Sequence, residues 1–118
     1  MKKILKALAL SLLLAAPLAS FAAGAIAVDD EVGDAEPGYG LVTGEGSRES
    51  ASSAALAMCR RSGNANCKVV ARFDTCGAYA SSKKFYGAGW GASEAAARSM
   101  AMERCGNDAC QVHVAECE

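Results

Sequence analysis

The residues of this sequence that could do chemistry are its six cysteines and its one histidine. The cysteines form two sets of three: Cys59, Cys67 and Cys76, then Cys105, Cys110 and Cys117. Thiolates can bind zinc, attack a substrate or pair as disulfides. The sequence has no Cys-x-x-Cys redox motif, and the even number leaves no odd thiol to act as a nucleophile. Disulfides are therefore favoured, with an all-cysteine zinc site as the weaker alternative.

Six cysteines allow many pairings, and the internal duplication selects among them. An approximate two-fold axis must map each bond onto an equivalent bond, which favours the short loops Cys59–Cys67 and Cys105–Cys110. Cys76 and Cys117, the two repeat ends, then remain as a pair across the axis. This is the preferred pattern, and it leaves no free thiol.

His113 is the second candidate for chemistry, as a general base. Strand periodicity places it on the face opposite Val112 and Val114, where it is partly exposed. Glu116 is the nearest acid in the sequence, and the counterpart of His113 in the first repeat is Val70. Because the repeat does not require an imidazole, we interpret His113 as a surface residue rather than a catalytic one.

The largest aromatic grouping is Phe85, Tyr86 and Trp90; the first two precede the glycine-rich segment 87–91, and Trp90 lies within it. The segment lacks the Lys-Ser/Thr of a P-loop and does not lie in a β-α-β unit, so its glycines are better explained by a bent strand or a closely packed helix. Aromatic side chains are core residues by default, and the alternative is a binding surface. Tyr86, Trp90 and His113 form the candidate partner surface; we predict no catalytic, cofactor-binding or metal-binding residues.

Residues 29–38 form an acidic stretch with glycine and proline and without periodicity, which predicts a loop. Its clustered carboxylates could attract calcium, but they do not match the EF-hand spacing with its terminal glutamate. We interpret this stretch as a solvated loop rather than a metal site.

These residues must be positioned by elements that occur twice. A helix is expected from the N-cap Ser47 to about Cys59, and again from Ser93 to Cys105 at an offset of 46 residues. Strands are expected where small and β-branched residues alternate or cluster: at 24–28, 39–43 and 67–73, then at 77–80, around 86–91 and at 110–115.

The predicted order in each copy is strand, strand, helix, strand. We expect an α+β domain of duplicated ββαβ units related by a pseudo-two-fold axis, with an antiparallel-rich sheet, both helices on one face, and disulfides that stabilise it. A helical bundle is the weaker alternative, because the glycine-rich and β-branched segments suit strands better.

The first 22 residues have the pattern of a secretory signal peptide: a lysine-rich start, an apolar run and small residues before a cleavage point after Ala22. The run is too short to span a membrane and is interrupted by Pro17. Residues 23–118 then form a single domain of two repeats, 24–76 and 77–118. We expect an exported protein, periplasmic or extracellular, with no membrane span in the mature chain.

Cleavage after Ala22 removes three lysines and leaves 9 basic residues (12 minus 3) against 13 acidic ones, a net charge of −4. A mildly acidic protein is poorly suited to nucleic acid or an anionic membrane surface. No nucleic-acid partner is therefore expected. The lack of a P-loop, zinc or redox motif also predicts no cofactor.

Several segments together resemble the domain-of-unknown-function family numbered 4189. They are Gly-Ala-Ile-Ala at 24–27, Ala-Leu-x-x-Cys at 55–59, Cys-Lys-Val-Val at 67–70, Cys-Gly-Ala at 76–78, Tyr-Gly-x-Gly-Trp-Gly at 86–91 and the closing Cys105, Cys110 and Cys117. The resemblance implies a small exported bacterial protein with a duplicated, disulfide-bearing domain, and it brings no catalytic residues. The chain departs from the family at Leu41-Val42-Thr43, where an aromatic glycine-rich stretch is more usual.

A cross-linked scaffold without a catalytic constellation favours a non-enzymatic module that binds a protein or a cell-envelope component, such as a secreted effector or an inhibitor. The alternatives are a small hydrolase that uses His113 with an acid or a serine, and a structural envelope component that self-associates.

Overall fold

The computed structural model describes residues 22–118, so the predicted signal peptide lies outside the described residues except for Ala22. The described elements are β1 (Ala23–Asp29), β2 (Gly38–Glu45), α2 (Arg48–Arg61), β3 (Lys68–Phe73), β4 (Cys76–Ser82), β5 (Phe85–Gly91), α3 (Glu94–Cys105) and β6 (Gln111–Cys117). The order ββαβ occurs twice, which confirms the predicted α+β fold of duplicated units. No helix among residues 22–118 is long and apolar enough to cross a membrane.

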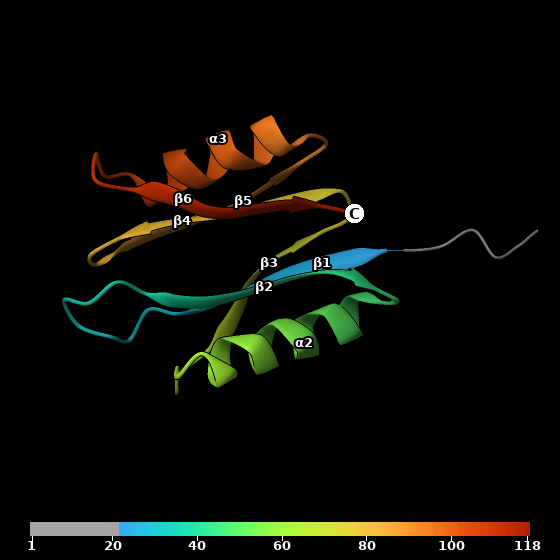
Figure 1. The fold of residues 1–118 in the computed structure, drawn as a ribbon, viewed down its shortest axis with the longest axis horizontal. Coiled ribbons are helices and arrows are strands. Elements are labelled where there is room, and N and C mark those ends of the chain that lie inside the picture. Colours follow the sequence, from blue (N-terminus) through green and yellow to red (C-terminus); the bar gives the residue numbers. More distant parts are fainter. Residues whose placement is uncertain (1–21) are drawn as a thin grey trace, which may run out of the picture.

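The strands form two antiparallel three-stranded sheets, in the orders β2-β1-β3 and β5-β4-β6. Figure 1 shows the sheets stacked in the middle of the molecule, with α2 (green) outside the first and α3 (orange) outside the second. The expected placement of both helices on one face is therefore wrong. Each helix covers the outer face of the sheet in its own unit.

The residues of the central strands explain this arrangement. In β1, Ala25 and Ala27 pack against α2, whereas Ile26 and Val28 face the other sheet. Every residue of β1 and of β4 is buried, so both strands are covered on both faces. Small residues let a helix approach one face, and large ones fill the layer between the sheets.

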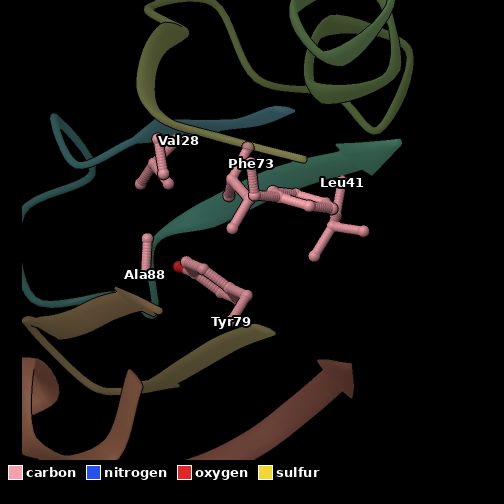
Figure 2. Packing of buried hydrophobic residues seen from close by; sticks show 7 residues of the cluster. Val28, Leu41, Phe73, Tyr79 and Ala88 are labelled. Atoms are coloured by element: carbon pink, nitrogen blue, oxygen red, sulfur yellow. The ribbon is translucent and has the colours of Figure 1, made fainter. Parts of the chain in front are cut away.

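The two units share this central layer. Figure 2 shows Val28, Leu41 and Phe73 from the first sheet facing Tyr79 and Ala88 from the second. The Phe73 ring lies over glycines at the starts of the two central strands, Gly24 and Gly77, where any Cβ atom would overlap the ring. One aromatic side chain therefore packs against both units.

Each helix begins at a serine N-cap, as predicted. The Ser47 hydroxyl accepts a hydrogen bond from the Ser50 amide, and the Ser93 hydroxyl accepts one from the Ala96 amide. Packing of α3 onto β5 explains the glycine-rich segment, because a Cβ atom at Gly89 would overlap the backbone of α3. A strand without side chains on this face lets the helix backbone approach closely.

Three disulfides are present, Cys59–Cys67, Cys76–Cys117 and Cys105–Cys110, and no cysteine is free. These are the pairs expected from the sequence. Cys59–Cys67 and Cys105–Cys110 each join the last turn of a helix to the segment before the next strand.

The Cys76–Cys117 bond differs from the expectation in its position. Cys76 begins β4 and lies opposite Cys117 on β6, so both belong to the second sheet. The bond therefore lies inside the second unit and does not cross the axis between the units. The structural boundary between the units falls before Cys76 rather than after it.

Candidate functional site

His113 lies at a β-bulge of β6, and the bulge changes which side chains of β6 point to the same face of the sheet. Along the pairing of β6 with β4, Val114 lies opposite Tyr79 and Val112 lies opposite Ala80, so His113 is the extra residue between them. The bulge shifts the side-chain phase by one residue. Val114 consequently packs in the layer between the sheets and Val112 packs on the α3 side. The prediction that these two valines share one inward face is wrong.

The loop between β1 and β2, residues 30–37, supplies the acid partner of His113; we call it the acidic loop. His113 Nε2 lies 2.6 Å from Glu36 Oε1, and the Ser81 hydroxyl donates to the same oxygen at 2.6 Å. Glu36 comes from the first unit, and His113 and Ser81 come from the second. A loop predicted to be solvated thus brings a carboxylate onto the opposite unit.

Further hydrogen bonds hold the acidic loop in place. The Lys84 amide donates to the Ala35 carbonyl at 3.2 Å, and the Tyr79 hydroxyl donates to the Pro37 carbonyl at 3.0 Å. Burial raises the pKa of Tyr79, which keeps its hydroxyl protonated as a donor. These contacts place Glu36 in a defined position rather than in a mobile loop tip.

The hydrogen bond from Ser81, followed by that from His113, lowers the pKa of Glu36, while desolvation opposes the shift. Glu36 is therefore ionised at neutral pH. Because an ionised carboxylate only accepts hydrogen bonds, His113 Nε2 carries the proton in this contact. The pair presents a fixed negative charge beside an imidazole.

Aromatic rings support this pair. Tyr39 stacks on Tyr79 with 4.3 Å between ring centroids, and the His113 ring lies 6.4 Å from Tyr39 and 6.3 Å from Tyr79. An open pocket of about 600 Å³ adjoins the cluster. Its wall includes Glu36, Tyr39, Met58, Asn64, Ser81 and His113. We call this the Glu36–His113 pocket.

The chemistry available here is binding or weak base catalysis. Ser81 is only 2 % exposed, and its proton is directed to Glu36 rather than to His113. It therefore lacks both the access and the base that a nucleophilic serine needs. His113 has a side chain one-third exposed and could contact a ligand or a water molecule. Among residues 22–118, no three His, Cys, Asp or Glu side chains are grouped to hold a metal ion.

The first unit has no such cluster at its equivalent position. The pairing of β3 with β1 contains the same bulge, and its extra residue is Val70 where β6 has His113. Val28 stands in β1 where β4 has Ser81. The fold therefore accepts aliphatic residues at both places, and the polar cluster is a feature of one site only.

The structure does not bring together the three residues predicted as a partner surface. His113 lies on β6 and Tyr86 on β5, at opposite edges of the second sheet, with the Tyr79 ring between them. Trp90 is further along β5, where the Arg104 guanidinium lies 4.6 Å from its ring centroid. Tyr86 and Trp90 therefore belong to a different surface from His113.

Sequence reasoning missed Glu36, Ser81 and Tyr39 as neighbours of His113. Glu36 and His113 are 77 residues apart, and Glu36 and Ser81 are 45 apart. No local motif joins them. The one available signal is the length of the acidic loop, which has no equivalent in the short turn between β4 and β5.

The family comparison covers both units. The model of a domain of unknown function, DUF4189, matches residues 23–117. The chain belongs to the DUF4189 family. This confirms the resemblance found in the sequence, and the DUF4189 match includes every residue of the Glu36–His113 pocket. No curated protein and no solved structure matches the chain.

Proposed function

We propose that this DUF4189 protein is an exported, non-enzymatic binding module that takes a protein or cell-envelope ligand in the Glu36–His113 pocket. The observation that carries the proposal is that Glu36, Ser81 and His113 meet at only one of two equivalent places in a duplicated fold. Valines serve the fold at the other place, so packing alone does not account for the polar residues. They hold the acidic loop in place, and Glu36 Oε2 beside the open pocket is the feature that we assign to a ligand.

The pocket favours a ligand that donates hydrogen bonds and carries an apolar part. Both protein donors use Glu36 Oε1, and Oε2 accepts no hydrogen bond from residues 22–118. An ionised carboxylate oxygen next to a pocket is a strong acceptor for an ammonium, amide or hydroxyl group. Tyr39 and Met58 provide apolar surface in the same wall. Peptide N-termini, amino groups and glycan hydroxyls supply such donors.

Export is supported by the cysteines and by the first residues of the chain. All six cysteines are paired as disulfides, which persist in an oxidising compartment such as the periplasm or the medium. The sequence of residues 1–22 has the pattern of a signal peptide. Three cross-links also provide a rigid scaffold, which reduces the entropy lost on binding.

Affinity capture tests the proposal. The oxidised domain, residues 23–118, is immobilised and exposed to the native envelope fraction and culture fluid. His113→Val is the matched variant, because valine stands at the equivalent bulge of the first unit. We expect one ligand that the wild type retains and His113→Val loses, while Arg104→Met, at the opposite edge of the second unit, retains it. A species held equally by wild type and His113→Val would refute the pocket as the ligand site.

A hydrolase is the second candidate, because the Glu36–His113 contact orients an imidazole beside an open pocket. In this function His113 would take a proton from a water molecule as it attacks the substrate. A His113→Ala variant that keeps every hydrolytic activity of the wild type excludes it. Self-association of the wild type in sizing experiments, without a captured ligand, would instead favour the structural envelope role.

A further inference from the structure

The edge opposite the Glu36–His113 pocket is formed by β3 and β5. Each is an outer strand of its sheet, and the two strands lie against each other across the layer between the sheets. No backbone group on the outer side of either strand is paired with another segment of residues 22–118. Unpaired strand edges can accept an added strand.

Two adjoining depressions of about 360 and 340 Å³ follow this edge and share Val70. The first is lined by four consecutive residues of β3, 69–72, and by Trp90. Because successive side chains of a strand point to opposite faces, four consecutive lining residues mean that the backbone edge itself forms the wall. Val70 is the bulged residue, so its backbone is also outside the regular pairing with β1.

The side chains along this edge are aromatic and cationic. Arg104 stacks on Trp90, is exposed, and has no carboxylate within ion-pair distance among residues 22–118. Tyr86 lines the second depression beside Arg104, and Arg72 lines the first. Tryptophan, tyrosine and arginine are the residues that contribute most to protein–protein binding.

We infer that this edge binds a partner protein. An acidic, extended segment of the partner adds a strand along β3. A carboxylate of that segment contacts Arg104, and its apolar side chains pack against Trp90 and Tyr86. The backbone edge supplies the strand pairing, and the unpaired guanidinium selects negative charge. This surface is separate from the Glu36–His113 pocket, so the inference does not depend on the proposed function.

The first unit shows that the fold does not require Trp90 or Arg104, whereas Tyr86 has a tyrosine counterpart in Tyr39. Thr43 and Met58 stand where the second unit has Trp90 and Arg104. A bulge and positive charges also protect an edge strand from unwanted pairing. Protection does not require a partly exposed tryptophan, which adds apolar surface that a partner would bury.

Trp90 makes the test direct, because it is the only tryptophan of the chain. The probe is a peptide of about six residues, the length of β3, in which glutamate alternates with valine. Its binding to the oxidised domain is followed by tryptophan fluorescence at low salt. Control peptides replace glutamate with glutamine, or carry N-methyl groups on alternate amides and so cannot pair as a strand.

We expect a saturable fluorescence change with the probe and at least about tenfold weaker binding for each control peptide. Arg104→Met should also weaken binding about tenfold, while His113→Val should leave it unchanged. No saturable change with the wild type would overturn the inference. Equal affinity for the N-methylated peptide would overturn the added strand, and equal affinity of Arg104→Met would overturn the role of the guanidinium.

Discussion

At the scale of single residues, Glu36 links the protonation of the protein to the docking of the acidic loop. Its pKa is lowered in the folded state, chiefly by the Ser81 hydrogen bond. A carboxyl group with a lowered folded-state pKa stabilises the fold above its unfolded-state pKa, and this contribution is lost as pH falls through the folded-state value. The side chain is nearly half exposed, so salt and solvent keep the contribution small.

The first prediction compares Glu36→Gln with the wild type. As pH falls below the ordinary glutamate range, the free energy of unfolding should decrease more steeply in the wild type, because only the wild type loses this contribution. Urea unfolding at a series of pH values measures it. The variant retains all other carboxyl groups, so the difference between the curves isolates Glu36. Parallel curves would show that docking of the loop does not depend on its charge.

The second prediction concerns the stability of His113→Val. The side chain is one-third exposed and its partner Glu36 is more exposed, so the contact contributes little net stability. Val70 shows that this bulge accepts valine. We expect the free energy of unfolding to change by less than about 1 kcal/mol in urea denaturation. A loss of several kcal/mol would mean that His113 serves the fold rather than a ligand.

At the scale of elements, the contact between α3 and β5 depends on glycine. A Cβ atom at Gly89 would overlap the carbonyl oxygen of Ala97 and the backbone of Ala101 in α3. Backbone atoms in a helix cannot rotate away as a side chain can. The helix must therefore move outward, and its small buried residues lose contact with the sheet.

The third prediction is that Gly89→Ala lowers the free energy of unfolding by about 1–3 kcal/mol through overpacking. Gly46→Ala is the matched control, because a Cβ atom there meets nothing within 4 Å and the backbone does not have a positive φ. The control should match the wild type within about 0.5 kcal/mol in urea denaturation. Equal stability of the two variants would show that α3 can shift at little cost.

At the scale of the whole molecule, each unit has too small a hydrophobic core of its own. Packing against the other unit and the disulfides supply the missing stability. The helix-facing layers consist mainly of alanine and cysteine, which bury little area per residue. The larger apolar side chains lie between the sheets, in the layer that both units share. Neither unit therefore has a complete core without the other.

The fourth prediction is that the disulfide that closes the longer loop contributes more to the free energy of unfolding. Cys76–Cys117 spans 41 residues and Cys105–Cys110 spans 5. In the chain-entropy model their removal costs at most about 4 and about 2 kcal/mol, respectively. Urea unfolding of the two paired Cys→Ala variants should follow that order. Alkylation of the wild type without reductant should add no mass, because all six thiols are paired; any added label would contradict the scheme.

The sequence by itself determined the features that depend on near neighbours. Ser47 and Ser93 cap their helices through hydrogen bonds that span three residues, and the alternation of small and β-branched residues in 24–28 marks a strand. The two short cysteine loops followed from spacing and duplication. These interactions are local, so the residue pattern contains them.

Tertiary structure decided what lies across the layer between the sheets. It separated one expected sheet into two, put Cys76 and Cys117 in the same unit, and split Tyr86 and Trp90 from His113. It also brought Glu36 across 77 residues to His113. These outcomes depend on a bulge that shifts side-chain phase and on a loop that docks on the opposite unit. Both follow from long-range packing, which no local pattern encodes.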